Sequence, residues 1–443
     1  MKRFSKTLVD MKDFLFLWLT QTFSQLGSSM TSFALILWSY EQTGSALSTA
    51  LLTVCSYAPY VLMSIFAGAL SDRWNKRATM LVCDALAATG TLLILVLHMT
   101  SGLRIWHLYL LNAFSGLMNT VQQPASDVAT TLLTPKDYYQ QASACRSFGN
   151  SLVNILTPVC AAALAAFAGV EVVFLFDLIT FAAAFLSLLF WIRLPRQEQD
   201  NSKPKEPVLQ SAKIGLQYLK KEKGILTLIL FLAAINLTAS MYNAALPAMM
   251  LTRAGGSETA YGVINTVTGL TMLLGSVIAS AVPAPKSRVR VICNTLLISM
   301  STENFFLAFG RSLPVWCIGA FLGWIVIPLM NANLDVVMRS HIPVDLQGRV
   351  YSVRNTFQFF TIPLGYGLGG ALVDHVFEPL MARQTADSLL VRLFGSGKGT
   401  GAAVLFLVLG FVGVITCLVF RRIKAIWKLE PPATPKEKEQ TTH

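Results

Sequence analysis

The stretch Gly68-Ala69-Leu70-Ser71-Asp72-Arg73-Trp74-Asn75-Lys76-Arg77 is a short charged interruption between two long apolar runs. An interruption this short leaves room only for a tight turn between two membrane helices, and its basic residues mark the side of the membrane that faces the cytoplasm. Gly68 lets two helix backbones approach closely, and Asp72 can accept hydrogen bonds from the free amides at the start of a neighbouring helix. The stretch therefore predicts a cytoplasmic hairpin between two transmembrane helices.

The composition of the whole chain is that of a membrane protein. Its 443 residues are 54% hydrophobic and only 13% charged, and the mean hydropathy is +0.56, which lies outside the range of soluble globular proteins. The formal net charge of +12 comes from short basic clusters beside apolar runs, so nucleic-acid binding is not expected. The seven cysteines lie in or beside apolar runs and have no disulfide or metal-ligand spacing.

Twelve apolar runs are long enough to cross the roughly 30 Å hydrocarbon core of a bilayer. The basic start of the chain precedes a run that has no cleavage pattern of a signal peptide, so we expect this run to be retained as the first span. The runs lie at about 14–39, 46–70, 78–99, 106–133, 138–168, 170–193, 225–251, 258–283, 290–310, 313–338, 349–375 and 401–421.

The spacing of these runs predicts an all-α membrane protein with twelve transmembrane helices in two pseudo-symmetric six-helix bundles. We expect an N-terminal bundle at 1–194, a cytoplasmic linker at 195–223, a C-terminal bundle at 224–424 and a cytoplasmic tail at 425–443. The lysine-rich linker contains one short amphipathic stretch, 209–219, suited to the membrane surface. Basic residues concentrate on the side of the linker and the termini, which places both termini in the cytoplasm.

An internal repeat supports two related halves. A shift of 208 positions superposes, without a gap, residue types that are uncommon in membrane segments. Two copies of one six-helix unit are the simplest explanation. The matched pairs are Asp127 with Asp335, Pro135 with Pro343, Asp137 with Asp345, and Arg146 with Arg354.

The charged hairpin resembles the loop between the second and third helices of major facilitator superfamily transporters, where a glycine, an Asp-Arg pair and a basic pair recur at this spacing. Asn75 departs from the pattern because a second glycine usually stands there, although asparagine tolerates the left-handed conformation. Three further motifs resemble the branch that holds bacterial macrolide and multidrug exporters, together with siderophore exporters and lysophospholipid transporters. They are Gln123-Pro124-Ala125, Leu132-Leu133-Thr134-Pro135-Lys136-Asp137 and Phe174-Leu175-Phe176-Asp177-Leu178-Ile179-Thr180-Phe181.

The resemblance implies a secondary active transporter of a bacterial inner membrane, whose halves rock around a central cavity. We expect proton-coupled efflux of hydrophobic drugs such as macrolides by alternating access. Transport of lysophospholipids, related amphiphiles or siderophores is the alternative, and a receptor or scaffold without transport is a remote one. The expected partners are a small amphipathic substrate, protons and the lipid bilayer, and we expect a monomer.

The resemblance also implies a gate at the cytoplasmic ends of the helices. Asp72 would cap the helix that starts near Arg349, and Asp127 lies at a depth where it can pair with Arg73 or Arg77. Because such contacts close one side of the cavity, these residues are expected to control access. The predicted gating residues are Gly68, Asp72, Arg73, Arg77, Asp127, Asp335 and Arg349.

Polar side chains on the helices that line the cavity in this family are the candidates for substrate contacts. We expect about half of them to join helices instead, because Asn and Gln hydrogen-bond across membrane helices wherever they meet. Arg146 and Arg354 lie about 13 Å into their helices, where they either form a positive cavity site, pair with an acid or snorkel. The predicted cavity residues are Gln21, Gln25, Asn112, Asn119, Arg146, Asn150, Asn236, Tyr242, Asn265, Asn331, Arg354 and Gln358.

Carboxyl groups inside the membrane are costly, so each is a candidate for function unless a neighbour pairs with it. The candidates for proton coupling are Asp127, Asp177, Glu303 and Asp335. Asp84, Asp177 and Glu303 fall on helices that are peripheral in the implied fold, and a supporting structural role is the favoured interpretation for these three.

Enzyme classes find little support. The five histidines lie at helix ends or termini without ligand spacing to one another. The segment 393–400 contains glycines and Lys398 but lacks the four-residue spacer of a phosphate loop. We expect no cofactor and no metal, so the energy for transport would come from an ion gradient or from the gradient of the substrate.

Overall fold

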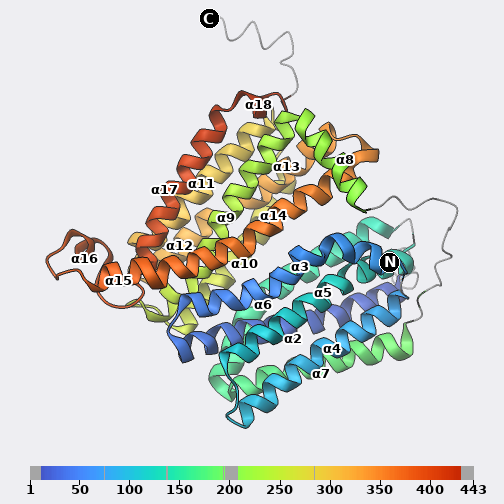
Figure 1. The fold of residues 1–443 in the computed structure, drawn as a ribbon, viewed down its shortest axis with the longest axis horizontal. Coiled ribbons are helices and arrows are strands. Elements are labelled where there is room, and N and C mark those ends of the chain that lie inside the picture. The colour runs from blue at the N-terminus through green and yellow to red at the C-terminus, as the bar shows by residue number, and fades with distance from the viewer. Residues whose placement is uncertain are drawn as a thin grey trace, which may run out of the picture.

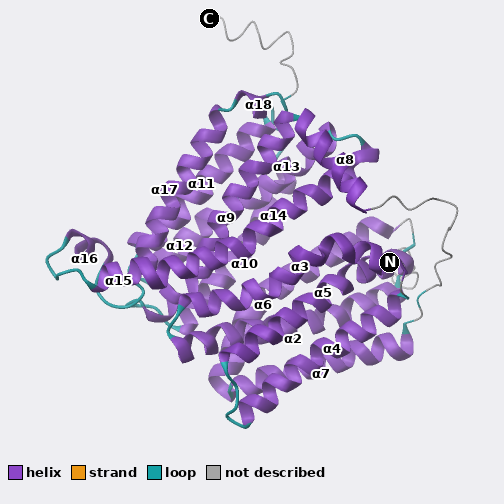
Figure 2. Ribbon diagram, in the orientation of Figure 1, coloured by secondary structure: helices purple, strands orange, loops and turns teal. Residues whose placement is uncertain are grey.

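The computed structural model describes residues 11–73, 75–135, 138–192, 194, 208–283 and 285–430. For some helical residues, including 64–73 and 347–349, only the backbone is described. The described residues are almost entirely helical and contain no strand (Figure 2). The predicted all-α fold is therefore confirmed.

The first half of the chain forms long helices joined by short turns. Gly44 ends the first of them with a φ of 59°, a left-handed conformation that glycine adopts without strain. Asn75 starts the third by accepting a hydrogen bond from the amide of Ala78 at 3.2 Å. The helices are α2 (Lys12–Thr43), α3 (Ala46–Arg73), α4 (Lys76–Met99), α5 (Ile105–Leu133), α6 (Tyr139–Ala168) and α7 (Val170–Leu186), which continues into a π-helical turn, η2 (Ser187–Trp191).

The second half begins with α8 (Val208–Lys221), a short helix in the predicted linker. One predicted span is divided into α12 (Leu313–Trp324) and α13 (Ile327–His341). Pro328 has no amide hydrogen to donate to the preceding turn, and the helix is interrupted there. The other elements are α9 (Lys223–Thr252), α10 (Glu258–Ala281), α11 (Arg288–Phe309), α14 (Val344–Leu372), η3 (Val373–Phe377), α15 (Glu378–Ala382), α16 (Leu389–Phe394), α17 (Thr400–Arg422) and α18 (Lys424–Trp427).

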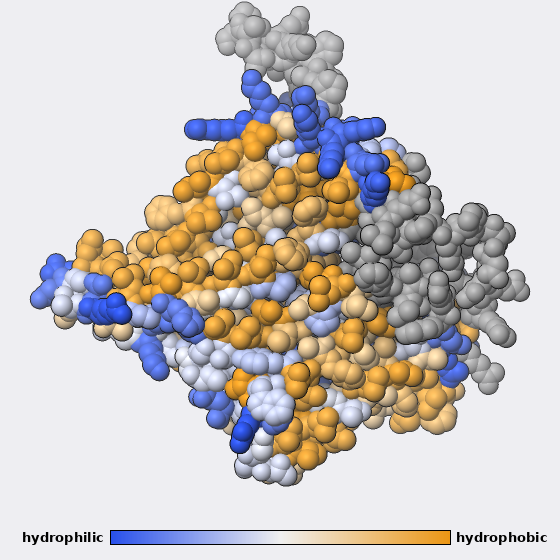
Figure 3. Space-filling view, viewed as in Figure 1, coloured by the Kyte–Doolittle hydropathy of each residue, from blue (hydrophilic) through white to orange (hydrophobic). Residues whose placement is uncertain are grey.

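Two groups of helices lie side by side, α2 to α7 and α9 to α17 (Figure 1). We call the end that holds α8 and α18 the linker end, and the end that holds α15 and α16 the loop end. Within the described ranges, nine helices are long and apolar enough to cross a membrane. The space-filling view shows apolar side chains along the flanks and hydrophilic ones at the tips (Figure 3), as expected for a protein that crosses a bilayer.

The two halves pack together toward the loop end. The largest buried cluster there combines residues of α2 with residues of α9, α10 and α17. Phe33 of α2 stacks on Tyr261 of α10 with ring centroids 5.0 Å apart. A Cβ on Gly370 of α14 would lie only 2.7 Å from the Cα of Leu47 of α3, so the absence of a side chain permits this close approach.

Toward the linker end, the buried clusters of the described residues each belong to one half. One joins Leu17 of α2 to Met80 of α4, and another joins Leu219 of α8 to Leu334 of α13. The buried apolar clusters that connect the halves are therefore found toward the loop end, among the side chains that the structure describes.

Candidate functional site

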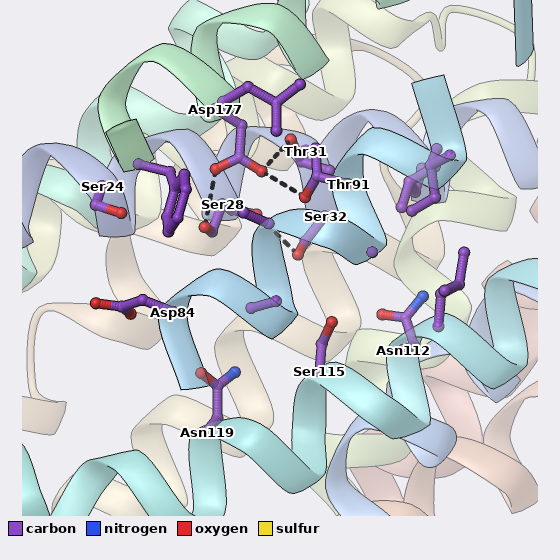
Figure 4. Close-up of a pocket in the computed structure, with 18 of the residues that line it drawn as sticks. Ser24, Ser28, Thr31, Ser32, Asp84, Thr91, Asn112, Ser115, Asn119 and Asp177 are labelled. Carbon is purple, nitrogen blue, oxygen red and sulfur yellow. Dashed lines mark hydrogen bonds between the residues drawn. The ribbon is translucent and has the colours of Figure 1, made fainter. Parts of the chain in front are cut away.

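A polar cavity of about 150 Å³ lies inside the first half, among α2, α4, α5 and α7 (Figure 4). Ser24, Ser28 and Thr31 of α2 line it, because residues three and four apart share one face of a helix. Such a run of hydroxyl groups gives an otherwise apolar helix a hydrogen-bonding stripe. Further lining residues are Asp84, Thr91, Asn112, Asn119, Gln122 and Asp177.

Asp177 of α7 is the more buried of the two carboxyl groups in this cavity and is 3% exposed. Its oxygens accept hydrogen bonds from three hydroxyl groups, those of Ser28 at 2.9 Å, Thr31 at 3.0 Å and Thr91 at 3.0 Å. A Cβ on Gly27 would lie 2.8 Å from the Cα of Asp177, which shows how closely α2 and α7 meet. The carboxyl group therefore joins α2, α4 and α7.

Asp84 of α4 is bound by two side-chain amides. Gln122 of α5 donates to Oδ1 at 2.5 Å, and Gln21 of α2 donates to Oδ2 at 3.4 Å. The ion pairs of the described residues include neither Asp84 nor Asp177. Both carboxyl groups are thus held by neutral donors, so either can bind a proton without breaking an ion pair.

Glu303 of α11 lies outside this cavity and is 3% exposed. Its Oε1 accepts a hydrogen bond from the indole of Trp324 at 2.6 Å. A Cβ on Gly323 would lie 2.6 Å from the Cβ of Glu303, so α11 and α12 are in tight contact here. In this position the carboxyl group joins the two helices.

Arg146 of α6 pairs with Asp127 of α5, with 2.5 Å between Nη2 and Oδ1. The sequence predicted that Asp127 pairs with Arg73 or Arg77. For Arg77, the structure shows a different contact. That guanidinium donates instead to the carbonyl oxygen of Leu188 at 2.9 Å, at the end of the sixth span, and the side chain of Arg73 lies outside those described. For Arg146, the structure shows one of the three alternatives that the sequence left open, pairing with an acid of a neighbouring helix.

The repeat-related Arg354 of α14 has a different environment. Its Nε is buried and has no hydrogen-bond partner. Asp335, the counterpart of Asp127, is exposed and takes part in neither ion pair of the described residues. The two halves therefore differ: the arginine of the first is paired with an acid, and no ion pair of Arg354 is found among the side chains that the structure describes.

Other predicted cavity residues are placed in several ways. Asn236 donates to the carbonyl oxygen of Gln358 at 2.8 Å and so joins α9 to α14. Asn112 and Asn265 each donate to a carbonyl oxygen four residues earlier in their own helix. Tyr242 is 5% exposed. Asn119 lines the cavity of the first half, and the exposed members of the set are Gln25, Asn119, Asn150 and Asn331.

The remaining gating residues cannot be placed by their contacts. Gly68, Asp72, Arg73 and Arg349 are among the helical residues for which only the backbone is described. The role predicted for them stays a prediction.

Sequence reasoning did not connect Asp84 with its amide donors. It placed the residue on a peripheral helix, because the order of the helices does not reveal the cavity behind α2 and α5. The signal that could have found the site is the series of hydroxyl residues on one face of α2, from Ser24 to Thr31.

The fold and its polar interior define a helical membrane protein of the transporter class. The profile of the Major Facilitator Superfamily matches residues 17–240. The chain therefore belongs to the Major Facilitator Superfamily and is a multi-pass membrane transporter, not an enzyme, as the sequence predicted.

Two relatives are named for efflux. Macrolide efflux protein A of Streptococcus pyogenes is 20% identical over 366 residues, which cover 81% of this chain and 89% of that protein. Multidrug efflux pump Tap of Mycolicibacterium fortuitum is 24% identical over 343 residues, which cover 75% of this chain and 82% of that protein. This chain is therefore similar to efflux pumps over most of its length.

Solved structures with the same fold include two in inward-facing states. A bacterial homolog of the human lysosomal transporter Spinster, inward-facing and occupied, has a TM-score of 0.69 at 15% identity and covers 95% of this chain and 98% of its own. A bacterial homologue of the iron transporter ferroportin, inward-facing, has a TM-score of 0.68 at 15% identity, covering 93% of this chain and 98% of its own. At such low sequence identities, these similarities show a shared fold and nothing about the substrate.

Proposed function

We propose that this protein exports amphipathic small molecules, with macrolides as the first class to test, across a bacterial inner membrane in exchange for protons. The relatives named for macrolide and multidrug efflux support the direction and the class of substrate. The concentration of Lys and Arg near the linker and the termini supports a cytoplasmic linker end. Transport then proceeds by alternating access of the two halves.

The environment of Asp84 carries the proposal of proton coupling. When ionised, its carboxylate accepts hydrogen bonds from Gln21 on α2 and Gln122 on α5. A protonated carboxyl group becomes a donor on one oxygen and is a weaker acceptor than the carboxylate, so its hydrogen bonds with the two amides are weakened or, where an amide turns its oxygen toward the proton, reversed. Proton binding thereby rearranges the contacts between three helices, and this is the link between protonation and conformation that coupling requires.

The other acids suit this role less well. Asp177 accepts from three hydroxyl groups, which satisfy an ionised carboxylate and hold three helices together. The charge of Asp127 is already balanced by Arg146. Glu303 is buried between α11 and α12 outside the cavity. We therefore assign proton exchange to Asp84 and a positioning role to Asp177.

The test uses purified protein in liposomes, with a labelled macrolide and an imposed proton gradient. Asp84→Asn should lower gradient-driven accumulation of the drug by about tenfold or more. Exchange of the drug without a gradient should continue. Asp177→Asn is the matched control: it should lower thermal stability but leave the folded protein coupled to the gradient. Full accumulation by the Asp84→Asn protein would refute the assignment of proton exchange to Asp84. Absence of macrolide transport by the wild type would refute macrolides as the substrate class.

A second candidate substrate class follows from Arg354. Its buried Nε has no hydrogen-bond partner, and a guanidinium group within a membrane segment favours an anionic group nearby. Lysophospholipids and siderophores carry such groups, so transport of an anionic amphiphile is the alternative to macrolide export.

A further inference from the structure

The start of α3 is capped by a side chain from the other half of the protein. Asp374, in the π-helical turn that follows α14, accepts hydrogen bonds from the amide of Ala46 at 3.0 Å and from the amide of Leu47 at 2.9 Å. It also accepts one from the hydroxyl group of Ser45 at 2.5 Å. Leu47 and Asp374 are 327 positions apart in the sequence, so this contact joins α3 of the first half to α14 of the second.

The local sequence leaves these amides free for Asp374. The first amides of a helix have no partner within the helix. The hydroxyl oxygen of Ser45 accepts from the amide of Ser48 at 3.0 Å. The amides of Ala46 and Leu47 then still need an acceptor. A carboxylate is the best partner for them, because it also interacts with the positive end of the helix dipole.

The backbone of α14 brings the carboxylate to this place. Gly370 lies one turn before Asp374, and a Cβ there would meet the backbone of Leu47 at 2.7 Å and that of Ala46 at 3.0 Å. The helix then widens into η3 (Val373–Phe377), and a π turn redirects the side chains that follow it. A glycine contact and a π turn therefore position one aspartate over the start of α3.

We propose that Asp374 is a gating residue that holds the loop end closed. The hydrogen bonds between Asp374 and the start of α3 lie where the two halves pack together, so they must break when the halves separate at the loop end. They also stabilise only the closed arrangement, because in the open one α3 and α14 are apart and water replaces both partners. The proposal rests on transport by alternating access.

The chain offers a matched control for this cap. Glu378 of α15 accepts from the amides of Gly399 at 2.9 Å and Gly401 at 3.1 Å, at the start of α17. It is also a carboxylate that caps the start of a membrane helix at the loop end. Both partners belong to the second half, so loss of this cap should not separate the halves.

The experiment measures the opening of the loop end directly, without transport. Spin labels on cysteines at Gln42 of α2 and Thr259 of α10, both exposed, report the distance between the halves in liposomes. Asp374→Asn should raise the ratio of long to short distances on the order of tenfold, since a charge-assisted cap is lost. Glu378→Gln should leave the distribution as in the wild type.

Two further variants keep the proposal testable if Asp374→Asn does not fold. Ser45→Ala removes the hydroxyl hydrogen bond to Asp374 and the one from the amide of Ser48. It leaves the amides of Ala46 and Leu47 bound to the carboxylate, so it should give a smaller shift in the same direction. Gly370→Ala forces α3 and α14 apart and should also favour long distances. An unchanged distribution in all three variants, or an equal shift in the Glu378→Gln control, would overturn the proposal. Because the measurement needs no substrate, a protein that does not export macrolides would still give a clear result.

Discussion

Arg146 and Asp127 form an ion pair between α6 and α5, and their side chains are 40% and 48% exposed. Because both groups remain accessible, the pair should contribute no more than about 1 kcal/mol to stability. We expect Arg146→Gln and Asp127→Asn each to lower the free energy of unfolding slightly, and the double variant to lose less than the sum of the two. Thermal unfolding of the four proteins in detergent measures this coupling, and strict additivity would show that the pair contributes nothing.

Arg354 should influence the choice of substrate, since its Nε is buried without a partner. Arg354→Gln is expected to weaken transport of anionic or zwitterionic amphiphiles about tenfold more than transport of neutral drugs, as the loss of one charge-assisted hydrogen bond would do. Arg146→Gln, at the matching position of the repeat, should show no such selectivity because Asp127 already balances its charge. Uptake of both substrate classes into liposomes tests the pair of variants, and equal loss for both classes in Arg354→Gln would mark that arginine as structural.

The orientation of the chain can be tested with single cysteines in a cysteine-free background. We expect a cysteine at position 205, in the predicted cytoplasmic linker, to react with an impermeant thiol reagent only from inside the cell. A cysteine at 385, between α15 and α16 at the loop end, should react only from outside. Reaction of both from the same side would contradict the predicted topology.

The sequence predicts that Asp72 caps the start of a helix near Gly348 and Arg349, whereas α14 begins at Val344. A cap on the free amides of α14 would therefore lie about one turn earlier, and it would still close the linker end. Asp72→Asn should therefore shift the protein toward the state open at the linker end and lower transport, with expression near normal. This shift is opposite to the one expected for Asp374→Asn, and cysteine accessibility at the two ends distinguishes them. Transport at the wild-type rate in the Asp72→Asn variant would show that the hairpin does not take part in gating.

The sequence predicts the fold well because the membrane restricts the choice of structure. Apolar runs of the required length can only be helices, and most helix boundaries follow from residues such as Gly44 and Asn75. The family followed from the charged hairpin and is confirmed by the profile match to residues 17–240. The break between α12 and α13 was not predicted, since Pro328 lies in an uninterrupted apolar run.

The candidate site was harder to predict because it depends on which helix faces touch. The shared depth of Asp127 and Arg146 at neighbouring helix ends did not reveal that they pair with each other. The sequence predicted only a supporting role for Asp84 and no role for Asp374, because each contacts partners that are distant in the chain. A hydrogen bond from a backbone amide to a side chain 327 positions away, such as that between Leu47 and Asp374, leaves no local pattern in the sequence.

The interruption between α12 and α13 is a point at which the two related halves differ. The matching helix of the first half, α5, is continuous from Ile105 to Leu133, whereas its repeat partner consists of two rods that meet at Ile325 and Val326. A proline near such a junction removes a hydrogen bond that would resist bending. Duplication has thus preserved the order of the helices but not their continuity: α5 remains unbroken although it contains Pro124, whereas the matching segment of the second half has a joint at which it can bend.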